Sequence, residues 1–295
     1  MLEQLYGAVE TYSKFFQEFI TYTNAPPAQK RQDTIINTVL IVGCGKMGSA
    51  LLEQWSKGPE SITVVDPGQQ SVPGGARLVS DRAALEGELF DCVIVAVKPQ
   101  MIDDVMPDYV EHLAPGGYVI SIAAGYTSAR LSAAMHDAPV VRVMPNLPAA
   151  IGRGVSGIFA SPEANEQHLT HAQEFMARAG ITVTVETEEQ LDRVTAVAGS
   201  GPGYVFEIAR AYVEVAMEHG FTEEQAREMV LGTMGGAIDM AAEPGALSLE
   251  ELRNSVTSKG GTTAAGLNAL NGDGGLTERL RATLQACYDR AVELR

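Results

Sequence analysis

Short runs of β-branched and aliphatic residues alternate with stretches of helical character through the first half of the chain. Strands that are apolar along their whole length are typical of a parallel sheet whose two faces are covered by helices. The pattern therefore predicts an α/β domain with a doubly wound parallel sheet. Its first strands are VLIV, SITVV, DCVIVAV, GYVISI and VVRVM, at residues 39–42, 61–65, 91–97, 117–122 and 140–144. Further strands at 155–160 and 181–185, with a helix at 163–179, are expected to complete it.

Beyond about residue 187 the strand pattern disappears and only helical patterns remain. Several of these segments are rich in Ala, Gly and Met, and small residues allow helices to approach closely, as in an extensive interface. We therefore expect the α/β domain at residues 37–187 and an all-helical dimerisation domain at 188–295. Residues 1–36 are predicted to be an N-terminal amphipathic helix and linker. The helices of the second domain are expected at residues 189–198, 202–219, 222–242, 247–256 and 275–294.

The composition excludes several classes of partner. Lys and Arg number 21 and Asp and Glu 37, which gives a formal net charge of −16. Such a field repels nucleic-acid phosphates and anionic membranes, so we expect neither as a partner. No apolar run approaches the roughly 20 residues that cross a bilayer. Three widely spaced cysteines suggest neither disulfides nor a metal site, and the N-terminus lacks a signal-peptide pattern, so a cytoplasmic location is expected.

A glycine-rich loop follows the first predicted strand. It matches G-x-G-x-x-G and opens a helix candidate, KMGSALLEQW. In this context the first glycine makes a tight turn, the second lets backbone approach a pyrophosphate, and the helix N–H groups bind that anion. The α/β domain is therefore expected to be of the Rossmann type and to bind a dinucleotide. The loop residues assigned to this role are Gly43, Cys44, Gly45, Lys46, Met47 and Gly48.

Asp66 ends the second predicted strand, where an acidic side chain can accept hydrogen bonds from the adenosine ribose. A ribose 2′-phosphate would meet like charge there, and the VDPGQQ loop at residues 65–70 supplies no arginine. This favours NADH over NADPH, although Asp66 would serve equally to cap the turn. The ends of later strands complete the crevice, and their small residues suit a flat nicotinamide ring. They are Ala96, Val97, Lys98, Pro99, Ile122, Ala123 and Ala124.

No histidine is a candidate for a catalytic acid, because none lies in a glycine-rich loop or at a predicted strand end. Each is expected to be a solvated helical residue. The segment 256–263 instead offers four hydroxyls and two glycines before a helix expected to begin near Ala264. Such a helix N-terminus can bind a carboxylate, although a loop that only caps the helices has the same composition. The histidines are His112, His136, His168, His171 and His219.

The order and spacing of these motifs resemble the pyrroline-5-carboxylate reductases over about residues 38–295. The resemblance implies hydride transfer from NADH or NADPH to the C=N bond of 1-pyrroline-5-carboxylate, which yields L-proline. It also implies a homodimer, in which each active site combines residues of two subunits, and it allows a larger assembly of dimers. The motifs that carry it are the glycine loop, AVKPQ (96–100), SIAAG (121–125), VRVMPN (141–146), AVAGSGPGYVF (196–206) and SKGGTT (258–263).

The same resemblance implies roles for individual residues. The Thr263 hydroxyl would bind the ring nitrogen as the catalytic group, and the amides of Gly261 and Thr262 would hold the carboxylate. Glu188, or else Glu189, would contribute to the substrate site. The whole substrate-binding set is Glu188, Ser258, Lys259, Gly260, Gly261, Thr262 and Thr263, and Ser255 falls where relatives touch the cofactor.

Three positions depart from the family pattern, and they leave the substrate and the activity open. Leu147 stands where threonine is usual, Lys259 where proline is usual, and Gly203 where alanine is usual. The substrate could then be pyrroline-2-carboxylate or a six-membered homologue. The chain could also be a hydroxy-acid dehydrogenase with Lys259 as its acid, or a catalytically silent dinucleotide-binding protein. Family analogy favours NADPH, whereas Asp66 favours NADH.

Overall fold

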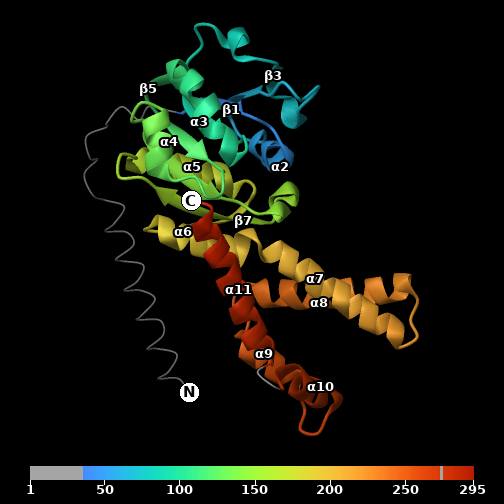
Figure 1. Cartoon of the computed structure of the whole chain (residues 1–295). Coiled ribbons are helices and arrows are strands. Elements are labelled where there is room, and N and C mark those ends of the chain that lie inside the picture. The colour runs from blue at the N-terminus through green and yellow to red at the C-terminus, as the bar shows by residue number, and fades with distance from the viewer. Residues whose placement is uncertain (1–35, 273–274) are drawn as a thin grey trace, which may run out of the picture. The chain divides into compact units, whose positions relative to one another are not determined.

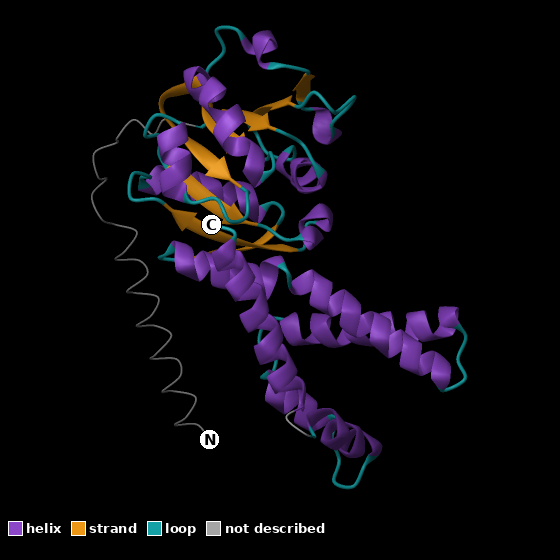
Figure 2. Cartoon of the chain, viewed as in Figure 1, coloured by secondary structure: helices purple, strands orange, loops and turns teal. Residues whose placement is uncertain are grey.

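The computed structural model describes residues 36–272 and 275–295. Apart from Ile36, the predicted N-terminal helix and linker lie outside the described residues. Residues 36–295 form one compact unit. Within it a mixed sheet with its helices is followed in the chain by helices alone (Figure 1; Figure 2). No helix of the described part is long and apolar enough to span a membrane.

The sheet has eight strands in the order β3-β2-β1-β4-β5-β6-β7-β8. All neighbouring strands are parallel except β6 and β7, so the last two strands, β7 and β8, run opposite to the other six; the doubly wound α/β fold is confirmed. The sequence pattern did not predict β3, which has only three residues, or the reversal of β7 and β8. The strands are β1 (Thr38–Val42), β2 (Ser61–Val65), β3 (Arg77–Val79), β4 (Phe90–Val95), β5 (Leu113–Ser121), β6 (Val140–Met144), β7 (Gly154–Ala160) and β8 (Gly180–Thr184).

The helices of the sheet region are α2 (Lys46–Trp55), α3 (Ile102–Val105), α4 (Ser128–Ala134) and α5 (Glu166–Ala177), with 3-10 turns η1 (Pro73–Gly75), η2 (Arg82–Leu85), η3 (Pro99–Met101), η4 (Met106–His112) and η5 (Leu147–Ile151). After β8 come α6 (Glu188–Val194), a π-helical turn η6 (Thr195–Gly199), α7 (Gly201–Glu218), α8 (Glu223–Ala242), α9 (Leu249–Ser255), α10 (Thr262–Asn271) and α11 (Gly275–Glu293).

Alternation along the central strands divides the core into two layers. Val39 and Ile41 of β1 belong to one buried cluster with Trp55 of α2 and residues of α5. Leu40 and Val42 belong to a second cluster with residues of α3, η4 and α4. Successive side chains of a strand point to opposite faces, so a strand that is apolar throughout must be covered on both sides. This is the physical basis of the predicted double layer of helices.

The helix expected at 189–198 is interrupted. α6 ends at Val194 and continues as the π-helical turn η6 before Pro202 enters the first turn of α7. A proline without an N–H and an inserted residue in the ladder both change the local winding. The Asn146 side chain, after β6, donates from Nδ2 to the Ala198 carbonyl at 3.0 Å and so ties this turn to the sheet.

Three histidines contradict the expectation that all five are solvated. His112 and His168 are buried, and His171 is largely buried because α5 packs against β5. The Tyr118 hydroxyl lies 2.6 Å from His171 Nδ1, and its ring stacks on His168 with centroids 4.7 Å apart. A helical position alone did not reveal which face meets the sheet.

The helices α7 and α8 leave most of their apolar side chains exposed. Only Ala209 is buried in α7, and only Ala226 and Val230 in α8. Continuous apolar faces of this kind normally meet a partner. The large exposed residues are Val205, Phe206, Ile208, Tyr212, Val215, Met217, Met229, Leu231, Ile238 and Met240.

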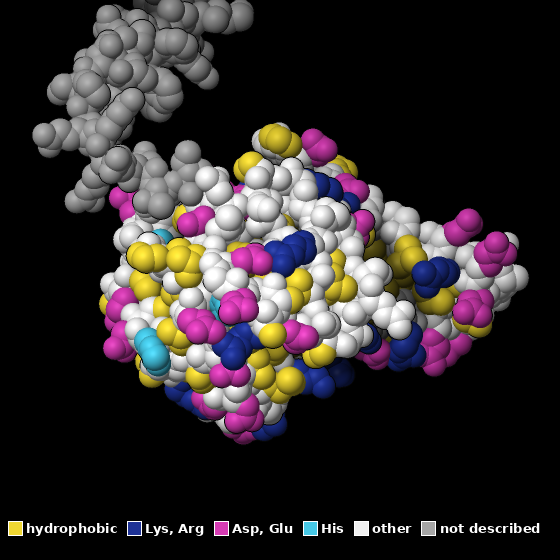
Figure 3. Space-filling model, turned by 90° about the horizontal axis from the view of Figure 1, so that it is seen from above, with side chains coloured by type: hydrophobic (Ala, Val, Ile, Leu, Met, Phe, Trp, Pro, Cys, Tyr) yellow, Lys and Arg dark blue, Asp and Glu magenta, His cyan; other side chains and the backbone are white. Residues whose placement is uncertain are grey.

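Charged side chains of both signs are interspersed over the described residues on the face shown in Figure 3. A nucleic-acid-binding protein presents a basic stripe or patch on the face that it uses. The mixture on this face fits the acidic net charge and offers no such stripe there.

Candidate active site

The glycine loop lies at the carboxyl end of β1, where it turns directly into α2. Gly43 has φ +86°, and its N–H donates to the Val65 carbonyl at 2.8 Å. A Cβ on Gly43 would lie 2.8 Å from Val97 Cγ1 and 3.0 Å from the Ala96 carbonyl. Glycine is therefore required here both by conformation and by the close approach of β4.

The space around the Cβ position is open at Gly45, whereas it is crowded at Gly43. A Cβ built on Gly45 would meet no atom within 4 Å, and no side chain caps the N-terminus of α2. The N–H groups of that first turn are thus available to an anion, and no side chain at Gly45 keeps a pyrophosphate away from the backbone. Lys46 and Met47 begin α2, and Gly48 packs against the Ala96 methyl group with its Cβ position 3.6 Å away.

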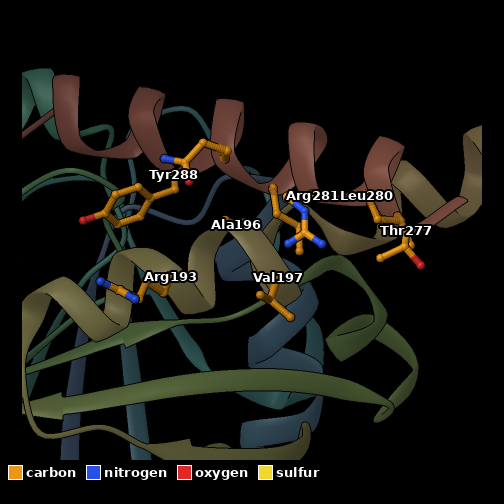
Figure 4. A pocket seen from close by; sticks show the side chains of 9 residues that line it. Arg193, Ala196, Val197, Thr277, Leu280, Arg281 and Tyr288 are labelled. Atoms are coloured by element: carbon orange, nitrogen blue, oxygen red, sulfur yellow. The ribbon is translucent and has the colours of Figure 1, made fainter. Parts of the chain in front are cut away.

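A cavity of about 650 Å³ elsewhere contains none of the predicted residues. It lies between α11 and the α6–η6 segment, where Arg193 and Val197 face Leu280 and Tyr288 (Figure 4). Its arginines are already paired, Arg193 with Glu189 at 2.6 Å and Arg281 with Glu278 at 3.2 Å.

The cavity beside the glycine loop has a volume of about 530 Å³. It brings together predicted residues from the ends of β1, β2 and β4, which is where parallel sheets of this kind bind a dinucleotide. The lining residues are Val42, Gly43, Cys44, Gly45, Val65, Asp66, Pro67, Ser80, Asp81, Arg82, Ala96, Val97, Lys98, Met101, Val105 and Tyr109. Pro99 follows Lys98 as the first residue of η3.

Asp66 directly follows β2 and holds the glycine loop in place. Its Oδ2 accepts from the Cys44 N–H at 2.6 Å, and its Oδ1 accepts from the Gly68 N–H at 2.8 Å. The carboxylate therefore both caps the turn and lines the cavity, so the two interpretations of Asp66 are compatible.

Sequence reasoning missed Arg82, which lines the same cavity. It donates to the Asp108 carbonyl at 3.2 Å and pairs with Glu111. Although the 65–70 loop contains no arginine, one reaches the site from the segment after β3. The signal was hidden because a three-residue strand is too short to show a period.

The loop after β5 lies next to β4 at the carboxyl edge of the sheet. Ser121 pairs with Val95, and the Ile122 N–H donates to the Val95 carbonyl at 3.2 Å. Ala123 is buried and Ala124 is exposed. These three loop residues lie outside the 530 Å³ cavity, beyond the end of β5.

Glu188 is the first residue of α6, but its carboxylate points into the sheet region. Its Oε1 accepts from the Arg142 guanidinium at 2.7 Å and from the Ser128 N–H at 2.8 Å. Partial burial would raise the pKa of Glu188, but these two donors outweigh it and hold the pKa below its usual value. Glu189 is exposed and pairs with Arg193.

The predicted substrate loop lies between α9 and α10. Ser255 ends α9 and donates to the Leu252 carbonyl at 2.7 Å, so its hydroxyl is used within the helix. Gly260 has φ +73°, and the Gly261 N–H donates to the Ser258 carbonyl at 3.0 Å. α10 begins at Thr262, two residues before the expected start, with no side chain capping it.

Ser258, Lys259, Gly260, Thr262 and Thr263 are exposed. A cavity of about 410 Å³ next to this loop is lined only by residues of α9, α10 and the loop between them. It shares no residue with the nucleotide cavity.

Within one chain, α11 separates the two halves of the predicted site. α10 directly precedes α11, and the far end of α11 reaches the loop after β5, where a Cβ on Gly125 would lie 2.6 Å from the Leu294 carbonyl (Figure 1). The helix has 19 residues and therefore spans about 28 Å. The described chain does not bring Thr263 to Ile122–Ala124.

Known proteins match both halves of the chain. A family model described as pyrroline-5-carboxylate reductase dimerisation matches residues 188–294, and one described as NADP oxidoreductase coenzyme F420-dependent matches residues 38–125. The pyrroline-5-carboxylate reductase of Haemophilus influenzae is 35% identical over 265 residues, which cover 87% of this chain and 97% of that protein. The corresponding protein of Methanosarcina acetivorans is 34% identical over 86% of this chain and 96% of its own length.

A solved structure agrees with these matches. The pyrroline-5-carboxylate reductase of Coxiella burnetii superimposes with a TM-score of 0.79 at 30% identity, and the match covers 88% of this chain and 98% of that one. The similarity thus spans both the glycine-loop region and the helical region in a single relative. This chain belongs to the pyrroline-5-carboxylate reductase family.

Proposed function

We propose that this chain reduces the C=N bond of 1-pyrroline-5-carboxylate and releases L-proline. The observation that carries the proposal is the glycine loop, which presents the open N-terminus of α2 to a cavity at the carboxyl edge of the sheet. Family membership supplies the substrate class. When bound, NADH or NADPH supplies hydride to the imine carbon and is itself oxidised, while the nitrogen gains a proton.

The residues of the sheet region hold the nucleotide. The N–H groups of Gly45 and of the first turn of α2 bind the pyrophosphate, because those of Gly43 and Cys44 already donate to the Val65 carbonyl and to Asp66. Asp66 accepts from the ribose hydroxyls, and Arg82 is the cation available to a 2′-phosphate. Lys98 and Ile122–Ala124 lie toward the nicotinamide end.

The helical region holds the imino acid. The Thr262 N–H binds its carboxylate, because the Gly261 N–H already donates to the Ser258 carbonyl. The Thr263 hydroxyl lies at the ring nitrogen to position or deliver the proton. Lys259 adds a positive charge beside the carboxylate, with Ser258 and Gly260 shaping the loop. Reduction of an imine needs no histidine acid, because the nitrogen is basic enough to be protonated before hydride arrives.

The complete site forms between two subunits. The length of α11 keeps Thr263 away from residues 122–124 of its own chain, which lie toward the nicotinamide end. The helices α7 and α8 also expose apolar faces of the kind that a partner covers. A homodimer through residues 188–295 therefore brings one subunit's loop 258–263 to the other's nucleotide, with Ser255 of that loop region near the cofactor. Dimers of this kind can build larger assemblies, and we expect the enzyme in the cytoplasm.

A spectrophotometric assay tests the proposal. Purified protein should oxidise NADH or NADPH when 1-pyrroline-5-carboxylate is added, and proline should appear in equal amount. Pyrroline-2-carboxylate and the six-membered homologue are assayed in parallel, because Leu147 and Lys259 depart from the family pattern. Binding of both nucleotides without turnover of any imino acid would contradict the proposal and identify a silent nucleotide-binding protein. Oxidation of a hydroxy acid by NAD would identify a dehydrogenase.

A further inference from the structure

A buried ion pair links the two ends of the loop that follows β5. Ser121, the last residue of β5, pairs with Arg142 in the register of β5 and β6. Ser128, the first residue of α4, donates its N–H to Glu188 Oε1 at 2.8 Å. The Arg142 guanidinium donates to the same oxygen at 2.7 Å. The six residues 122–127 therefore begin next to Arg142 in the sheet and end at a backbone N–H that is bonded to Glu188.

The pair is buried deeply enough to remain formed while the domain is folded. The Arg142 side chain is 2% exposed and that of Glu188 is 23% exposed. Glu188 is the acidic partner of the guanidinium, and Arg142 Nε has no hydrogen-bond partner among the described residues. Removing one member of a buried pair leaves an uncompensated charge, which is strongly unfavourable.

The pair also links the loop to the start of the helical region. Glu188 is the first residue of α6, and Thr187 caps that helix through the Gln190 N–H. A shift of Glu188 would therefore move the N-terminus of α4 and the loop together. The sheet strand β6, through Arg142, is the fixed point of this arrangement.

We propose that Glu188 and Arg142 are positioning residues that hold residues 122–127 in the geometry that receives the nicotinamide ring. This inference rests on the proposed function, and it replaces contact with the imino acid as the role of Glu188. Glu188 Oε1 already accepts two hydrogen bonds from protein groups. Glu188 thus orients a backbone loop, and its effect on the substrate is transmitted through the bound nucleotide.

The experiment compares Glu188→Gln with Glu60→Gln. Glu60 is a buried acidic residue of the sheet region that pairs with Arg178 at 2.6 Å and does not line the nucleotide cavity. Both variants should lower the midpoint of thermal unfolding. Calorimetry measures affinity for NADH and for ADP-ribose, which lacks the nicotinamide, and steady-state kinetics gives kcat and the KM of each substrate.

For Glu188→Gln we expect ADP-ribose affinity within about twofold of wild type, while the additional affinity of NADH is lost and kcat falls about 10- to 100-fold. The KM of the imino acid should change little, and Glu60→Gln should keep the wild-type kinetics. Glu188→Asp keeps the negative charge, but its side chain is one methylene shorter. It replaces Glu188→Gln if that variant does not fold, and the same changes in nucleotide affinity and kcat are expected for it.

Two results would overturn the inference. A selective rise in the KM of the imino acid with unchanged kcat would make Glu188 a substrate-binding residue. Unchanged kinetics in a variant with lowered thermal stability would make the pair purely structural. A wild-type protein that binds NADH but reduces no imino acid would instead refute the proposed function, while the comparison of NADH with ADP-ribose would still test the loop.

Discussion

Gly43 and Gly45 belong to the same loop but are glycines for different reasons. Gly43 has positive φ and no room for a methyl group, so Gly43→Ala should lower the free energy of unfolding by more than about 2 kcal/mol. Gly45→Ala should cost no more than about 1 kcal/mol, the effect of a poorer N-cap, because its methyl group meets open space.

Gly45→Ala should affect nucleotide affinity strongly although it affects stability little. Its methyl group would occupy the cavity, so we expect at least an approximately tenfold loss of NADH affinity in a protein of nearly normal stability. Denaturant unfolding and calorimetry on the same preparations check both results. Wild-type affinity in Gly45→Ala would show that the pyrophosphate does not approach this residue.

Arg82 decides whether a 2′-phosphate has a cationic partner. Arg82→Met should weaken NADPH relative to NADH by about 5- to 10-fold at low salt, the value of one exposed charge-assisted hydrogen bond. Arg77→Met is the control, because Arg77 pairs with Glu88 at 2.7 Å and does not line the cavity. The ratio of kcat/KM for the two nucleotides is the measurement. An unchanged ratio would exclude Arg82 from nucleotide recognition.

Thr263 is the residue on which the proposed proton chemistry depends. Thr263→Ala should reduce kcat by roughly 10- to 1000-fold, because a hydroxyl that positions or protonates the ring nitrogen acts in the transition state. NADH affinity should be unchanged. Thr283→Ala, in the middle of α11, is the control and should retain wild-type turnover. Wild-type kinetics in Thr263→Ala would remove this hydroxyl from the mechanism.

At the scale of elements, α5 is joined to the sheet through a buried polar cluster. His171 Nδ1 contacts the Tyr118 hydroxyl, and His171 Nε2 lies 3.6 Å from Glu60, which also pairs with Arg178. Burial lowers the pKa of His171; Glu60 opposes this shift, and Arg178 adds to it. Because burial prevails, His171 is neutral in the folded protein at neutral pH.

This cluster should make stability depend on acid. The pKa of His171 is lower in the folded chain than the usual 6.5, so the unfolded chain takes up the proton first. The contribution of neutral, buried His171 to the free energy of unfolding is complete above pH 6.5. It is lost as the pH falls from there through the pKa of His171 in the folded chain. Denaturant unfolding at pH 7.5 and 5.5 should show a smaller loss in His171→Gln than in the wild type. Equal losses would assign the acid sensitivity to other groups.

At the scale of the whole molecule, activity should require two subunits. Thr263→Ala and Gly45→Ala chains each damage a different half of the site. In a mixed dimer, the nucleotide half of one chain and the substrate loop of the other are both intact, which gives one native site. Random mixing should therefore recover about one quarter of wild-type activity. Coexpression followed by the reductase assay measures this, and activity no higher than that of either variant alone would place the whole site within one chain.

Phe206 and Ile238 test the interface itself, because both are large and exposed on the helices α7 and α8. Phe206→Asp with Ile238→Asp should convert the dimer to monomers in light scattering and abolish turnover, while nucleotide binding in the sheet region persists. Leu89→Asp, at an exposed residue of the sheet region, is the control. Retention of the dimer would exclude these faces from the interface.

The sequence alone determined the strands, the first helix of the sheet region and the glycine loop, because each of these depends on residues that are neighbours in the chain. The β-branched runs predicted all strands except three-residue β3, and the helix KMGSALLEQW begins and ends at the predicted residues, Lys46 and Trp55. The glycine loop and Asp66 were predicted because a tight turn, a strand end and a helix start are fixed by adjacent residues. The domain boundary at 187 and 188 and the roles of loop 258–263 stay predictions.

Contacts between distant segments were decided only by the tertiary structure. Arg82 reaches the nucleotide cavity from beyond β3, the histidines of α5 turn toward Tyr118, and Glu188 turns inward to Arg142. The sequence period shows that a side chain lies on one face of an element, but not which distant charge or ring it meets there. That choice depends on strand order and helix packing, which form only when the whole chain is folded.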